Sequence, residues 1–114
     1  MGTTARNETW LWIAQRASAA VLALCVLVHL ATIIFAVQDG LSAAEILART
    51  RGNAWWLGFY GVFVLACAVH APIGLRCTFA EWLGWRGPSR DAALLAFAAL
   101  IAVLGLRAIL GVFL

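Results

Sequence analysis

Three long apolar stretches, separated by short polar connections, dominate the sequence. Their apolar cores contain a single formal charge, that of Arg107. A helix needs roughly 20 predominantly apolar residues to cross the hydrocarbon core of a membrane, and each stretch is long enough. We therefore predict three membrane-spanning helices at about residues 10–38, 54–82 and 90–114.

Composition favours a membrane protein over a soluble one. Of the 114 residues, 65% are hydrophobic and 11% are charged. A soluble domain of this length cannot bury so much apolar surface, so lipid must cover the remainder. We predict that residues 1–114 form a single all-α membrane domain. The eight arginines are scattered, and this argues against nucleic-acid binding.

The connections carry helix and turn signals. Ser42 and Glu45 form a capping box, which predicts a short helix at about 42–51 lying along the membrane surface. Gly87 and Pro88 break the chain before the third span. Indole rings prefer the membrane interface, and the tryptophans lie near the predicted span ends: Trp10, Trp12, Trp55, Trp56, Trp82 and Trp85.

The arginines indicate an orientation. One side of the predicted topology carries five of them: Arg6, Arg16, Arg76, Arg86 and Arg90. The opposite connection carries two arginines and two acidic residues. Because positively charged loops stay on the cytoplasmic side, we expect a cytoplasmic N-terminus and an outer C-terminus.

Polar residues in the first two spans recur at steps of three and four, which places them on one face of each helix. The first face carries Gln15, Ser18, Cys25, His29 and Thr32, and the second carries Tyr60, Phe63, Cys67, His70, Gly74 and Cys77. Polar residues inside a membrane face other helices rather than lipid. We therefore expect the two histidine faces to meet in a common interior.

Two interior histidines favour a haem site. Neutral imidazole is a good axial ligand for haem iron, and the chain has too few carboxylates or cysteines for a non-haem centre. Gly74 lies one turn beyond His70, where the missing side chain lets a flat macrocycle approach. Arg76, near the interface, is placed to pair with a haem propionate. The alternative is that each imidazole is buried and bonded internally.

Two segments resemble a known family. His70-Ala-Pro-Ile-Gly74-Leu-Arg76 resembles the H-x-x-x-G-x-R segment of the cytochrome b anchor subunits of succinate dehydrogenase and fumarate reductase. Gln15-Arg16-Ala17-Ser18-Ala19 is similar to the Arg-x-Ser segment near the quinone pocket of the same family. The similarity covers the first two spans, about two-thirds of the chain.

The resemblance implies a non-catalytic subunit of a succinate:quinone oxidoreductase-type complex in the bacterial inner membrane. A flavoprotein subunit oxidises succinate, an iron–sulfur subunit relays electrons, and the anchor supplies haem b and a quinone site. By this likeness His70 is an axial ligand, Arg76 contacts a propionate, and Arg16 and Ser18 bind quinone. Trp12 and Gln15 stand where one branch has serine and histidine, and Trp12 is placed to wall the pocket.

Depth decides how the histidines are used. His29 lies roughly 20 Å along its helix from Arg16, and His70 roughly 9 Å from Arg76. The two histidines therefore differ in depth by about 10 Å and cannot share one haem within one chain. We expect a second anchor chain, identical or homologous, that completes a six-helix bundle with two haems b. The alternative is one haem, with His29 merely buried.

Two further alternatives stay open. Arg107 either extends outward to the membrane surface or pairs with a propionate of an outer haem at the level of His29. The chain as a whole is either this electron-carrying anchor or a cofactor-free structural anchor or assembly subunit. A transporter is disfavoured because the spans lack paired acidic residues and broken helices.

Overall fold

The computed structural model describes residues 5–114, and every element in this range is a helix. The helices are α1 (Ala5–Asp39), α2 (Ala43–Thr50), α3 (Ala54–Trp82) and α4 (Pro88–Phe113). The three long ones are apolar enough and long enough to cross a membrane. The prediction of an all-α membrane protein with three transmembrane helices is confirmed.

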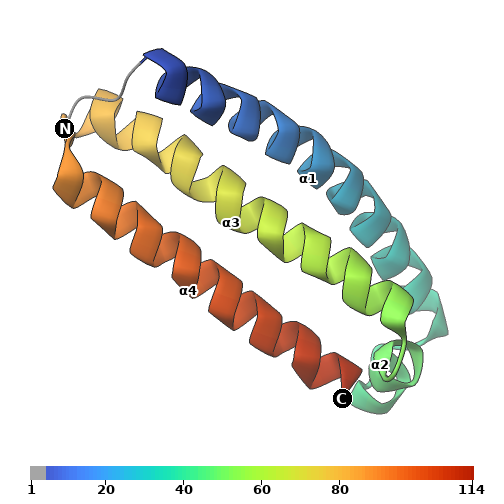
Figure 1. The fold of residues 1–114 in the computed structure, drawn as a ribbon. Coiled ribbons are helices and arrows are strands. Elements are labelled where there is room, and N and C mark those ends of the chain that lie inside the picture. Colours follow the sequence, from blue (N-terminus) through green and yellow to red (C-terminus); the bar gives the residue numbers. More distant parts are fainter. Residues whose placement is uncertain (1–4) are drawn as a thin grey trace.

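The long helices lie side by side with α3 in the middle (Figure 1). Both α1 and α4 pack against α3, and they make almost no contact with each other. The N-terminal end of α1 and the α3–α4 turn lie at one end, and α2 and the end of α4 lie at the other (Figure 1). The longest dimension is 51 Å, enough to cross the 40–45 Å of a bilayer with its headgroups.

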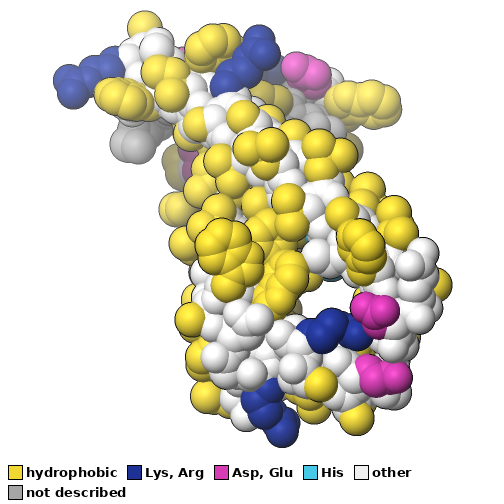
Figure 2. All heavy atoms as spheres, turned by 90° about the vertical axis from the view of Figure 1, so that its right-hand side faces the viewer, with side chains coloured by type: hydrophobic (Ala, Val, Ile, Leu, Met, Phe, Trp, Pro, Cys, Tyr) yellow, Lys and Arg dark blue, Asp and Glu magenta, His cyan; other side chains and the backbone are white. Residues whose placement is uncertain are grey.

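The bundle has few buried side chains, and most of these are small. They are Ser18, Cys25, Ala66, Ala80, Arg90, Leu94 and Ile109. Large apolar side chains lie outside instead, such as Leu24 at 67% exposure and Leu95 at 73%. Figure 2 shows this apolar surface over the length of the molecule. Small residues between helices and large ones outside are the arrangement expected when lipid is the solvent.

The helix α2 begins at the predicted capping box. The Ser42 side chain accepts a hydrogen bond from the Glu45 backbone N–H, and the Glu45 carboxylate accepts from the Ser42 backbone N–H. The hydrogen bonds from the Ser42 side chain and backbone lower the pKa of Glu45, so this carboxylate keeps its charge. The capping-box prediction is confirmed.

The last residue of α2 and the segment after it close the end of α4. The Thr50 hydroxyl donates to the Val112 carbonyl at 2.9 Å, and the Gly52 N–H donates to the Phe113 carbonyl at 2.8 Å. The last carbonyls of a helix have no partner within it, so these bonds satisfy two of them. Gly52 has a φ of +68°, a conformation that glycine adopts without strain.

The third span starts at the predicted break. Gly87, with a φ of +97°, precedes α4, and Pro88 occupies its first turn, where no backbone N–H is needed. Pro72 lies inside α3, and the helix continues through it to Trp82.

Candidate functional site

The two histidine faces meet between α1 and α3, as predicted. His70 Nδ1 lies 3.3 Å from the Ser18 hydroxyl, and His29 Nδ1 lies 3.0 Å from the Tyr60 hydroxyl. Both contacts cross from one helix to the other. Ser18 is buried, and both histidines are partly exposed. The interface therefore carries two separate imidazole–hydroxyl pairs.

The two pairs lie at different levels along the bundle. Ser18 and His29 are eleven residues apart on α1, and Tyr60 and His70 are ten apart on α3. The helical rise of 1.5 Å per residue separates the two levels by about 15 Å. This separation is larger than the 10 Å expected from the arginines. The two imidazoles of one chain are therefore too far apart to bind one iron.

The hydrogen bonds of Ser18 favour one tautomer of His70. The Ser18 hydroxyl lies 3.1 Å from the Gln15 carbonyl, and when it donates its proton there it accepts from His70 Nδ1–H. In that tautomer Nε2 keeps its lone pair. Among residues 5–114 no side-chain hydrogen bond reaches that Nε2. A metal-bound histidine uses its two nitrogens in the same way.

His29 has aromatic neighbours. Its ring stands edge-on to Tyr60 and Phe63, with centroid distances of 5.6 and 5.8 Å. A cavity of about 390 Å³ opens beside it, between α1, α2 and the start of α3. Its lining includes His29, Thr32, Arg49, Trp56 and Tyr60. The sequence analysis did not identify Tyr60 as the partner of His29. The available signal was the position of Tyr60 on the second polar face.

Gln15 occupies the space next to Gly74. A Cβ on Gly74 would lie 3.3 Å from Gln15 Nε2, so the amide fills the place that sequence reasoning kept for a macrocycle. Gln15 Oε1 is buried, and within residues 5–114 it has no hydrogen-bond partner. A buried carbonyl without a partner costs about 1–3 kcal/mol. This oxygen is therefore a place where a donor from a ligand or a neighbouring subunit would be favourable.

Arg76 is engaged in ion pairs. Its guanidinium lies 3.1 Å from a Glu8 oxygen and 3.7 Å from an Asp91 oxygen, and 18% of the side chain is exposed. The sequence analysis placed Arg76 near the interface but did not identify Glu8 and Asp91 as its partners. Both lie in the first turn of a helix that starts at this end, which was the available signal.

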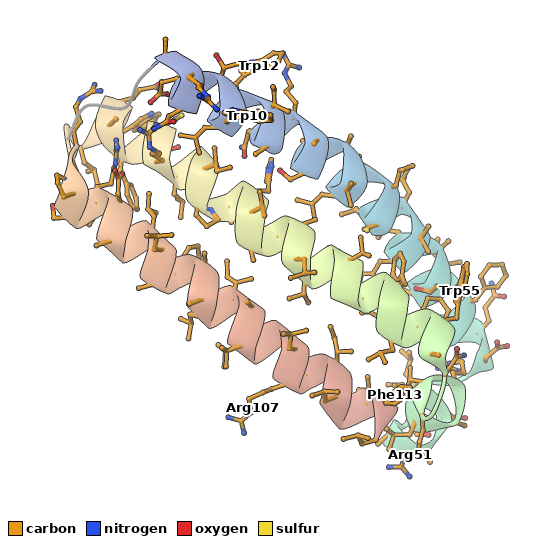
Figure 3. The ribbon with its side chains drawn as sticks, viewed as in Figure 1. Trp10, Trp12, Arg51, Trp55, Arg107 and Phe113 are labelled. Atoms are coloured by element: carbon orange, nitrogen blue, oxygen red, sulfur yellow. The ribbon has the colours of Figure 1, made fainter. Side chains whose placement is uncertain are left out.

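Arg16 and Trp12 lie away from the histidines. The Arg16 guanidinium carbon is 5.1 Å from the centre of the Trp12 ring, and both side chains are exposed. Arg16 is two residues before Ser18, a turn of about 200° around α1. Figure 3 shows Trp12 on the side of α1 that faces away from α3. The structure thus joins Gln15 and Ser18 to His70, and leaves Arg16 and Trp12 on the outer side.

Arg107 lies outside the interface. It is exposed on α4, and its side chain points away from the bundle (Figure 3). Within residues 5–114 no three His, Cys, Asp or Glu side chains come together to hold a metal ion. A metal bound at either histidine therefore needs further ligands from outside this range.

One of three comparisons with known proteins gives a match. Residues 3–107 match the sequence model of the family described as "Succinate dehydrogenase/Fumarate reductase transmembrane subunit". No curated protein and no solved structure gives a significant match. The match covers far more than half of the chain and includes the three transmembrane helices almost completely. The chain therefore belongs to the transmembrane subunits of succinate dehydrogenase and fumarate reductase.

Proposed function

We propose that this membrane subunit binds haem b and quinone, and passes electrons between an iron–sulfur subunit and membrane quinone. The observation that carries the proposal is the His70–Ser18 pair. When Ser18 donates to the Gln15 carbonyl and accepts from His70 Nδ1–H, His70 Nε2 has a free lone pair at the interface of α1 and α3. Haem b, when bound, supplies a one-electron carrier there.

His29 is the second proposed axial ligand. Its Nδ1 pairs with Tyr60, so its Nε2 is the nitrogen available for iron. The separation of about 15 Å supports two haems, each completed by a histidine from a second anchor chain. That chain, identical or homologous, would complete a six-helix bundle. A single haem at His70, with His29 only hydrogen-bonded, is the alternative.

The two histidines suit haem b well, and the residues around them suit it less completely. Gln15 must turn aside before a macrocycle can lie against Gly74, and its unpartnered Oε1 means that no hydrogen bond to this oxygen has to be broken. Arg76 would have to share its guanidinium among Glu8, Asp91 and a propionate. A guanidinium has five N–H donors, enough for one hydrogen bond to each of these three anions.

Quinone is proposed to bind near the same end of α1. Gln15 Oε1 offers an unused acceptor, and the Ser18 hydroxyl lies one turn away. Arg16 and Trp12 lie on the opposite side of the helix, so a neighbouring subunit must complete any pocket that uses them. Membership of the family supports partner subunits, and we propose that these are an iron–sulfur subunit and a flavoprotein subunit.

The proposed location is the bacterial inner membrane, with the N-terminus in the cytoplasm. The end with the N-terminus of α1 and the α3–α4 turn carries five arginines against three acidic residues, and the other end carries three against two. Because arginine-rich connections stay in the cytoplasm, this asymmetry supports the orientation.

A reduced-minus-oxidised absorption spectrum of the purified complex tests the proposal. We expect b-type bands and two haems per pair of anchor chains. His70→Ala and His29→Ala should each remove one haem, while Thr32→Ala, one turn from His29, should keep both. A complex without b-type bands would refute the haem assignment, and loss of haem only from His70→Ala would support the single-haem alternative.

A cofactor-free structural anchor is the second candidate. It is favoured by the internal bonds of both histidines, the ion pairs of Arg76 and the amide that fills the space next to Gly74. This candidate predicts a colourless preparation that still holds its soluble partner subunits. It also predicts that the histidine substitutions change stability but no absorption band.

A further inference from the structure

Arg107 projects from α4 on the side away from α3. Gly105 packs against α3 so closely that a Cβ there would lie 2.5 Å from Val64 Cγ1. A residue two positions further along a helix is turned by about 200°. Arg107 therefore points away from α3, as Figure 3 shows.

The surface around Arg107 is apolar. Val103, Leu104 and Leu110 are 55%, 56% and 47% exposed. Within residues 5–114 the Arg107 guanidinium forms no ion pair and no side-chain hydrogen bond. A charge at this depth is unfavourable unless it finds a partner or reaches the surface. Arg107 lies six residues before Phe113, about 9 Å by helical rise, so its long stem can carry the guanidinium to the headgroups.

A second arginine stands at the same end of α4. Arg51 is exposed, and its neighbour Gly52 donates a hydrogen bond to the Phe113 carbonyl. Arg51 therefore lies beside the last turn of α4, at the level where headgroups are expected. In Figure 3 the side chains of Arg51 and Arg107 both point away from the bundle on the same side. Within the described chain Arg51 also has no ion pair.

Neither acidic residue of this end, within residues 5–114, pairs with Arg51 or Arg107. The Glu45 carboxylate accepts hydrogen bonds from the Ser42 backbone and hydroxyl, and Asp39 lines the cavity that also contains Arg49. Figure 2 shows the acidic side chains of this end gathered near one basic side chain at the rim of a hollow, with another basic side chain apart from them. Arg51 and Arg107 thus carry positive charges that pair with no carboxylate among residues 5–114, at an end with three arginines and two acidic residues.

We propose that Arg51 and Arg107 bind the phosphate of an anionic phospholipid at the membrane end that carries α2. A guanidinium binds phosphate oxygens through two parallel hydrogen bonds. The lipid chains would lie against the exposed Leu104 and Leu110 of α4. A carboxylate on a neighbouring transmembrane helix fits less well, because Arg51 stands outside the apolar part of the bundle, where phosphates lie. The site is separate from the histidine interface and goes beyond the proposed function.

Native mass spectrometry of the purified protein, in detergent with equal amounts of phosphatidylglycerol and phosphatidylcholine, tests this site. We expect the protein to retain phosphatidylglycerol in preference, with about a fivefold enrichment for each arginine next to the headgroup. Arg107→Gln and Arg51→Gln should each reduce the enrichment by that factor. Arg6→Gln makes the same charge change at the other end and should leave it unaltered.

Several outcomes would overturn the site. Equal retention of the two lipids, or an enrichment that survives both substitutions, would show that these arginines do not recognise a headgroup. Displacement of the lipid by millimolar inorganic phosphate would indicate a free-anion site instead. If the Arg107→Gln variant loses a partner protein chain, Arg107 belongs to a subunit contact instead. If the variant loses a haem, Arg107 pairs with a propionate instead.

Discussion

The hydroxyl groups of Ser18 and Tyr60 orient the two imidazoles of the chain. When the Ser18 hydroxyl donates to the Gln15 carbonyl, its oxygen accepts from His70 Nδ1–H. The Tyr60 hydroxyl, 3.0 Å from His29 Nδ1, holds the other ring. Each hydroxyl is thus a positioning group whose loss should alter one imidazole and spare the other.

Ser18→Ala and Tyr60→Phe form a matched pair of changes. If both histidines bind haem, each substitution should weaken haem binding at its own histidine by about 10–100-fold and shift the reduction potential of that haem. The physical reason is that an imidazole without its oxygen partner is a poorer and less well oriented ligand. Redox titration of the absorption bands resolves the two centres.

Thr78→Ala is a suitable control for both changes, because the Thr78 hydroxyl bonds only to the Gly74 carbonyl of its own helix. It should leave both potentials in place. If each of the two substitutions shifts the reduction potentials of both haems equally, the two sites are not separate. If haem binding is unchanged in both variants, these hydroxyls do not position the imidazoles.

Sequence reasoning found the polar faces but not all of their contacts. Steps of three and four residues place Ser18 and His70 on interior faces, since helical periodicity fixes direction. The same periodicity cannot say that Arg76 reaches Glu8, 68 residues away, because that pairing depends on the relative height of two helices. It also could not place the Gln15 amide next to Gly74.

At the scale of the helices, α3 and α4 are in close contact at Gly105. A Cβ there would lie 2.5 and 2.8 Å from the two methyl carbons of Val64 and 3.2 Å from its Cβ. Valine has one strongly preferred rotamer in a helix and cannot turn aside. The two helices can pack at this distance only because residue 105 has no side chain.

Gly105→Ala should therefore separate α3 from α4 and destabilise the protein by about 1–3 kcal/mol. Thermal unfolding in detergent, followed by tryptophan fluorescence, measures the change. Gly111→Ala is the matched control, because a Cβ at Gly111 meets no atom within 4 Å. It should be neutral or slightly stabilising, since alanine favours helix over glycine.

Adding Val64→Ala to Gly105→Ala should restore part of the lost stability, because the smaller side chain makes room for the new methyl group. If Gly105→Ala and Gly111→Ala unfold at the same temperature, the close contact at Val64 does not determine helix packing.

The elements themselves follow from the sequence to different degrees. The apolar pattern predicts three transmembrane helices, and Ser42 with Glu45 predicts the start of α2, since both signals are local. The start of α1 at Ala5, about a turn before the predicted span, has no apolar signal because these residues are polar. A helix continues beyond the hydrocarbon layer wherever its polar side chains reach water or a partner.

On the scale of the whole molecule, α3 connects two helices that hardly touch each other. At the end that carries α2, the segment after α2 bonds to the last carbonyls of α4. At the other end, Arg76 joins Glu8 of α1 to Asp91 of α4. The sequence could not predict this arrangement, because three apolar helices of similar length allow several neighbour orders. The second anchor chain of a six-helix bundle stays a prediction.

Asp91 is the acidic centre of the ionic cluster that joins the three helices. Its Oδ1 lies 2.8 Å from an Arg90 nitrogen and 3.7 Å from Arg76 Nε, and only 7% of the Arg90 side chain is exposed. Asp91→Asn keeps the shape but leaves Arg90 buried without a counter-charge. Because Asp91 is 44% exposed, we expect a loss of about 1–3 kcal/mol rather than the larger penalty of a fully buried pair. Thermal unfolding measures it, and Asp39→Asn, which breaks no ion pair within residues 5–114, is the control. Equal stability of these two variants would show that the cluster does not hold the helix ends together.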